Sequence, residues 1–115
     1  MIKKKTYIQI NICLDENNIP EIINWTAQDG NIIKEPCNAF ILSFWNFKKK
    51  DSYRIDLWTK EMLLVDMNLF FYQIFISMAD TYKRATSNDN IAIEIYNFGQ
   101  KFAKISKIYK YGINS

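Results

Sequence analysis

The spacing of apolar residues changes once along this chain, near residues 59–61, and this change constrains the fold more than any other feature of the sequence. Before it, apolar residues alternate with polar ones or form short runs, as expected of β-strands. After it, apolar residues recur at intervals of three, four and seven, which is typical of one face of an α-helix. Strands therefore come first and helices second, which indicates an α+β fold.

Four strands are predicted in the first part of the chain. Residues 6–14 alternate between apolar and polar side chains, and a return strand is expected at about 21–26. A strong Asp-Gly turn signal follows, so we expect 31–36 to be a loop. Residues 37–47 are almost continuously apolar, which favours a central strand, and residues 53–59 return after a lysine-rich loop. In sequence order, these strands form a four-stranded antiparallel meander sheet.

Two helices are predicted in the second part. The first covers about five turns and ends at Lys83 or Arg84, whose charges complement the helix dipole. Residues 86–89 offer several N-caps for the second helix. Its apolar stripe consists of Ile91, Ile95, Phe98, Phe102 and Ile105. The short connection predicts a C-terminal antiparallel two-helix hairpin, which we expect to pack on one sheet face.

The length favours a single domain over residues 1–115, because one core usually occupies roughly 100 to 200 residues. The longest apolar stretches, 39–45 and 69–72, are far shorter than the roughly 20 residues that cross a bilayer, so no direct membrane span is expected. The basic start resembles a signal peptide, but Gln9 and Asn11 interrupt the apolar core that such a peptide needs. A cytoplasmic protein is the resulting expectation.

The residue types argue against an enzyme. Histidine is absent, which removes the commonest general base at neutral pH and the commonest metal ligand. The three glycines form no phosphate-binding loop, and Cys13 and Cys37 are expected to remain thiols. The net charge is only +3, and 12 acidic residues offset dispersed lysines, which disfavours nucleic-acid binding. We therefore predict no catalytic residue, no metal and no cofactor.

Two groups of residues are candidates for an interaction surface. The segment 37–47 carries apolar side chains in both directions, so one face can cover the core while the other meets a partner or a second copy. On the strand at 53–59, three residues share one face, and Trp and Arg contribute strongly to interfaces. The candidates are Phe40, Leu42, Phe44, Arg54, Asp56 and Trp58. The alternative is that these apolar side chains are core, with Arg54 and Asp56 in an ion pair.

Several blocks of the sequence occur in an order that is characteristic of one family. These blocks are Leu14-Asp15-Glu16-Asn17, Pro20-Glu21, Trp25, Asp29-Gly30, the run from Arg54 to Lys60, Phe70-Phe71, and the run from Ser77 to Thr86. Together they resemble the gliding motility protein GldC family of the Bacteroidetes. The chain differs at Leu63, where the family tends to have proline, and at Tyr72, where it tends to have histidine. The resemblance implies a leaderless accessory protein of the gliding machinery without enzymatic activity. It also implies a membrane-anchored Gld lipoprotein, or another component of that machinery, as the partner.

Other hypotheses remain open. Four strands followed by two helices is also the order of elements in the export chaperone SecB, so a holdase-like chaperone or peptide-binding protein is the second hypothesis, on analogy of fold order alone. An enzyme is the third. The abundance of lysine, isoleucine and asparagine suggests an AT-rich genome. This leaves open a reduced-genome source that does not glide, in which the protein has a housekeeping role.

Overall fold

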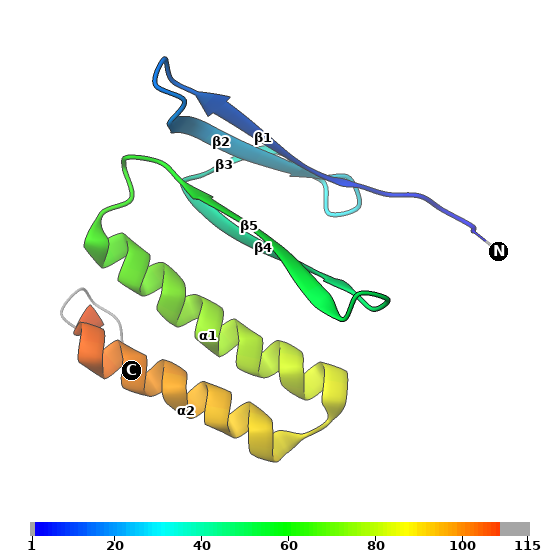
Figure 1. Cartoon of the computed structure of the whole chain (residues 1–115), viewed down its shortest axis with the longest axis vertical. Coiled ribbons are helices and arrows are strands. Elements are labelled where there is room, and N and C mark those ends of the chain that lie inside the picture. Colours follow the sequence, from blue (N-terminus) through cyan, green and yellow to red (C-terminus); the bar gives the residue numbers. More distant parts are fainter. Residues whose placement is uncertain (1, 109–115) are drawn as a thin grey trace. The chain divides into compact units, whose positions relative to one another are not determined.

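The computed structural model describes residues 2–108. These residues form two compact units, with the boundary between residues 62 and 63 of the chain. The first unit contains five strands, β1 to β5, and the second contains two helices, α1 and α2 (Figure 1). The α+β class predicted from the change of period is therefore confirmed.

Three strands form the first sheet, in the order β1-β2-β3. These are β1 (Ile8–Leu14), β2 (Pro20–Ala27) and β3 (Ile32–Cys37), and neighbouring strands are antiparallel. In this register Ile10 lies opposite Trp25 and Ile12 lies opposite Ile23. Their side chains share one face because successive residues of a strand point to opposite sides. Ile23 is only 1% exposed, so this apolar face supplies the core of the first unit.

The prediction of a loop at residues 31–36 was wrong, because these residues form most of β3. Two residues, Lys34 and Pro36, interrupt the pattern by which a strand is recognised in the sequence. Lys34 has a positive φ of 48°, and the register of the pair β2-β3 shifts between Trp25 and Ala27. Pro36 lacks an N–H for the ladder, but β3 is an edge strand in which proline is tolerated. The irregular backbone at Lys34 is anchored by Thr26, whose Oγ1 accepts a hydrogen bond from the Lys34 N–H at 3.1 Å.

The remaining strands, β4 (Ala39–Asn46) and β5 (Asp51–Trp58), form a separate two-stranded sheet (Figure 1). The prediction of one four-stranded meander was therefore wrong, as was the prediction that residues 37–47 form a central strand. The reason lies at Asn38, where the chain leaves the first sheet. The Asn38 carbonyl accepts a hydrogen bond from the Thr59 N–H at 2.9 Å, and its Nδ2 donates to Thr59 Oγ1 at 3.1 Å. Asn38, the corner between β3 and β4, is thus hydrogen-bonded to the residue that follows β5.

The helices are α1 (Leu64–Thr86) and α2 (Asp89–Ser106), and they form the predicted antiparallel hairpin (Figure 1). Helix α1 ends at Thr86, two residues beyond Arg84. Its C-cap is Ser87, which has a left-handed φ of 57°. Asn88 caps α2, and its Oδ1 accepts a hydrogen bond from the Ile91 N–H at 3.2 Å. Neither helix is long and apolar enough to cross a membrane.

Small residues allow the two helices to pack closely. Ala79, Ala92, Gly99 and Ala103 are buried. A Cβ atom on Gly99 would lie 2.9 Å from Ile76 Cδ1 and 3.2 Å from Phe75 Cβ, which is tighter than ordinary contact. Beside this contact, the Phe75 ring packs edge to face against Phe98 and Phe102, with centroid distances of 5.2 and 5.3 Å. The second unit therefore has its own core. The packing of this hairpin on a sheet face stays a prediction.

Candidate functional site

The hairpin of β4 and β5 has a regular register, which fixes where each of its side chains points. A tight loop at residues 47–50 joins the strands, and Asn46 organises it. Its Oδ1 accepts hydrogen bonds from the N–H groups of Lys48 at 3.1 Å and Lys49 at 3.0 Å. Lys50 completes the loop with a positive φ of 52°. From Asn46 opposite Asp51 to Ala39 opposite Trp58, the strands pair without a bulge.

This register gives the hairpin two faces. The apolar face consists of Phe40, Leu42, Phe44, Tyr53, Ile55 and Leu57. The mixed face consists of Ala39, Ile41, Ser43, Trp45, Ser52, Arg54, Asp56 and Trp58. The six residues predicted from the sequence therefore fall into two groups of three on opposite faces. Phe40, Leu42 and Phe44 belong to the apolar face, and Arg54, Asp56 and Trp58 belong to the mixed face.

On the mixed face, Arg54 Nε donates to Asp56 Oδ2 at 3.0 Å. Both side chains are exposed, so the pair itself contributes little stability. An open hollow of about 740 Å³ lies against these residues and is also lined by Ser43, Ser52, Tyr53 and Ile55. Two tryptophans, Trp45 and Trp58, belong to the same face and are also exposed. The face thus combines a fixed charge pair with large apolar groups.

On the apolar face, burial changes along the hairpin. Phe40 and Leu42, near the corner, are half-buried. They line an apolar hollow of about 210 Å³ together with Ile8, Ile10, Trp25, Cys37 and Ala39. Phe44 and Tyr53, nearer the loop, are exposed. Phe40 and Leu42 therefore contribute to the interior of the first unit, while Phe44 and Tyr53 are available on its surface.

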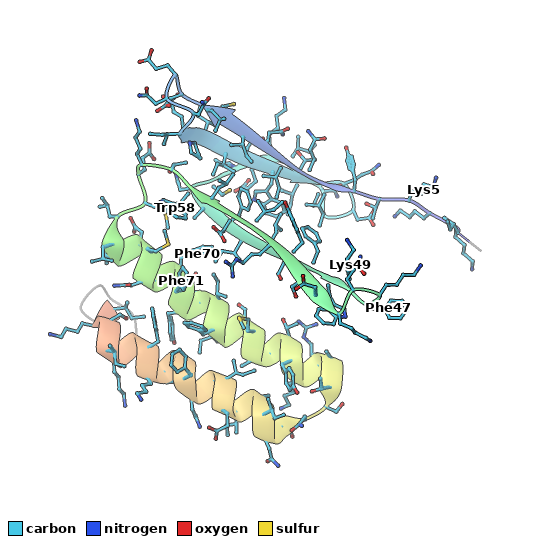
Figure 2. All side chains as sticks on the ribbon, viewed as in Figure 1. Lys5, Phe47, Lys49, Trp58, Phe70 and Phe71 are labelled. Carbon is cyan, nitrogen blue, oxygen red and sulfur yellow. The ribbon has the colours of Figure 1, made fainter. Side chains whose placement is uncertain are left out.

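Aromatic groups are the main exposed feature of the hairpin. Figure 2 shows Phe47 at its tip, close to Lys49, and Trp58 at the opposite end of β5. The Lys50 ammonium lies 5.6 Å from the centroid of the Phe47 ring, which is a cation–π contact. Five aromatic side chains are each 54–70% exposed: Phe44, Trp45, Phe47, Tyr53 and Trp58. Trp45 and Trp58 belong to the mixed face, Phe44 and Tyr53 belong to the apolar face, and Phe47 lies in the loop, so the exposed aromatic surface is divided between the two faces.

Three of these aromatics, Trp45, Phe47 and Tyr53, were absent from the sequence-based candidates. The alternation of residues within β5 was visible in the sequence, but its pairing with β4 was not. Had the turn at 47–50 been used to pair Asn46 with Asp51, Trp45 would have been placed opposite Ser52 and on the same face as Trp58.

The backbone of the hairpin adds a second feature. Among the residues that the structure describes, β4 pairs only with β5, so each strand has one edge without a neighbouring strand. Such an edge presents free N–H and C=O groups and can accept an added strand. A two-stranded hairpin is also marginally stable in water unless something packs against it. Both properties suit a surface that another chain covers.

Both cysteines are free, and burial raises the pKa of the Cys37 thiol, which outweighs the opposing effect of a hydrogen bond with the Ala39 backbone. The thiol therefore stays protonated at neutral pH and is a weak nucleophile. Within residues 2–108, no three Cys, Asp or Glu side chains gather in a way that could hold a metal ion.

Comparison with known proteins gives one match. Residues 20–108 match the family described as "Gliding motility-associated protein GldC-like". The match includes β2 to β5 and both helices, whereas β1 precedes it. No curated protein and no solved structure matches the chain.

Proposed function

Because the chain belongs to the GldC-like family of gliding motility-associated proteins, we propose that it is a non-enzymatic accessory protein that binds another protein through its β4-β5 hairpin. The observation that carries this proposal is the set of five exposed aromatic side chains on a hairpin whose outer edges pair with no strand of residues 2–108. Exposed Trp and Tyr groups of this size are costly in water and are enriched at protein interfaces.

The proposed partner is a membrane-anchored Gld lipoprotein or another component of the gliding machinery. The family membership supports this choice of machinery, and the hairpin supplies the surface. Arg54 and Asp56 line the open hollow and pair with each other. When another chain binds, each of the two can instead pair with a polar group of that chain. A source in the Bacteroidetes and a cytoplasmic location stay predictions, which sequencing of the source genome and cell fractionation test.

The experiment is affinity capture from the native host with the tagged full-length chain. Trp45→Ser with Trp58→Ser removes the two tryptophans of the mixed face. Tyr7→Ser is the matched control, because Tyr7 is also half-exposed but precedes β1. We expect the wild type and the control to recover a Gld component and the double variant to lose at least about tenfold of it, as when interface tryptophans are removed.

A strictly monomeric wild type that recovers no Gld component would contradict the proposal. Equal recovery by the double variant and the control would place the binding surface elsewhere. Circular dichroism of each variant separates loss of binding from loss of folding. If the source genome lacks the gliding genes altogether, the housekeeping role replaces the motility role, and the same capture experiment identifies the partner.

A second candidate function is a holdase-like or peptide-binding role. The supporting observation is the apolar hollow of about 210 Å³ beside Phe40 and Leu42, which is large enough for an apolar side chain. An extended peptide could pair with a free edge of the hairpin and insert a side chain there. Suppression of the aggregation of a denatured client at stoichiometric amounts would favour this role. Capture of one specific Gld component, with no such suppression, would exclude it.

A further inference from the structure

A second surface lies on α2 and is unrelated to the hairpin. Five apolar residues of this helix are spaced four, three, four and three apart, whereas Ile93 and Tyr96 lie outside this pattern. This is the heptad spacing of a coiled-coil seam. The seam consists of Ile91, Ile95, Phe98, Phe102 and Ile105.

Helix α1 does not cover the whole seam. The α2 residues that are fully buried are Ala92, Gly99 and Ala103, which lie to one side of the seam. Ile95 and Phe102 are half-buried. Ile91, Phe98 and Ile105, each seven residues after the one before, remain 44%, 50% and 68% exposed. One half of the heptad pattern therefore serves the packing inside the second unit. The other half is largely exposed, although one side of Phe98 meets the Phe75 ring at 5.2 Å.

The charges beside the seam indicate what covers it. Glu94 and Lys101 flank the seam on the side away from Ala92 and Gly99, seven residues apart and with opposite signs. Both side chains are exposed, and neither forms an ion pair within residues 2–108. In an antiparallel pair of identical helices, positions of this kind face each other across the seam. Glu94 of each copy then meets Lys101 of the other, twice per dimer.

We propose that two copies of this chain associate through α2, with the two α2 helices antiparallel. In this arrangement Ile95 lies across from Phe98 of the second copy, and Ile91 lies across from Phe102. Each α1 stays beside its own α2, so the assembly is a four-helix bundle built from two helical hairpins. A parallel pair would instead place Glu94 and Lys101 near small uncharged residues, which gives their charges no partner.

The test is a charge exchange in the full-length chain, read by sedimentation velocity over a roughly hundredfold range of concentration. Glu94→Lys alone and Lys101→Glu alone each turn both attractive contacts into repulsive ones. We expect the dimer dissociation constant to rise about tenfold in either single variant. The double variant Glu94→Lys with Lys101→Glu restores opposite charges, and it should return to within about threefold of the wild type.

Lys104→Glu is the matched control, because it changes the net charge by the same amount as Lys101→Glu but lies on α2 away from the seam. Circular dichroism confirms that each variant remains helical. A monomeric wild type would overturn the proposal, and so would single variants that dimerise as tightly as the control. Failure of the double variant to recover would overturn the antiparallel self-pairing, because an unrelated partner or a parallel pair cannot be rescued by this exchange.

Discussion

At the scale of single residues, Gly99 allows α2 to approach α1 closely. We predict that Gly99→Ala lowers the free energy of unfolding by about 1 kcal/mol. The new Cβ gains helix propensity, worth about 1 kcal/mol, but it meets Phe75 Cβ at 3.2 Å and Ile76 Cδ1 at 2.9 Å, and overpacking costs about 1 to 3 kcal/mol. The end of Ile76 can move, whereas Phe75 Cβ is fixed to the backbone of α1.

The control for Gly99 is Asn97→Ala on the exposed part of the same helix, which should raise stability by about 0.5 kcal/mol through propensity alone. Urea denaturation measures both variants. If Gly99→Ala were as stabilising as Asn97→Ala, the close approach of the helices would be wrong.

The carboxyl group of Asp15 links the stability of the first unit to pH. Its pKa is lowered, first by the hydrogen bond from the Ile19 N–H and then by Lys60, whose Nζ lies 3.0 Å from Oδ2. A carboxyl group whose pKa is lowered in the folded state stabilises the protein at pH values above the pKa of the unfolded state, which is about 3.9 for Asp. That contribution is lost as the pH falls through the lowered pKa of the folded state.

We therefore predict that the wild type loses stability between about pH 5 and pH 2 by more than Asp15→Asn does. The amide oxygen introduced by this substitution can still accept from the backbone of Asn17 and Ile19, but the amide carries no charge that depends on pH. Urea denaturation followed at several pH values checks this. Parallel pH profiles for the two proteins would contradict it.

At the scale of elements, the hairpin of β4 and β5 should tolerate loss of its tryptophan far better than the first sheet tolerates loss of its core. We predict that Trp58→Ala costs about 1 kcal/mol, because more than half of its side chain is already in water. Ile23→Ala should cost about 3 kcal/mol, since Ile23 is 1% exposed. Denaturant unfolding measures both. A cost of about 3 kcal/mol for Trp58→Ala would make it a core residue and remove it from the binding surface.

The elements also show how much of the fold could be predicted from the sequence. The alternation in β1, β2 and β5 and the heptad-like stripe of α2 were sufficient to predict those elements, because each pattern has the period of its secondary structure. Prediction failed for β3, where a left-handed Lys34 and Pro36 break the alternation. The strand pairing failed for a different reason. The hydrogen bonds between Asn38 and Thr59 join residues 21 positions apart, and no local pattern records them.

The same distinction applies to the candidate site. The residue types of Arg54, Asp56 and Trp58 and their common face could be predicted from spacing alone. Their exposure, and the inclusion of Trp45 on that face, depend on the register with β4 and on the corner at Asn38. Exposure is a property of what lies beside a residue in space, so it required the structure.

At the scale of the whole molecule, the two compact units carry separate spectroscopic reporters. All three tryptophans, Trp25, Trp45 and Trp58, belong to the first unit, whereas both helices belong to the second. Each unit also has its own buried residues, with Ile23 in the first and Ala92 and Ala103 in the second. We therefore expect each unit to unfold as its own cooperative element.

The prediction is that Ile23→Ala lowers the midpoint of the tryptophan fluorescence transition while the helical signal in circular dichroism moves much less. Gly99→Ala should do the reverse. For about 1 kcal/mol of destabilisation, a unit of this size shifts its melting midpoint by roughly 4 to 8 °C, which either probe can resolve. Equal shifts of both signals for both variants would show a single two-state transition instead, because one cooperative event gives the same midpoint to every probe.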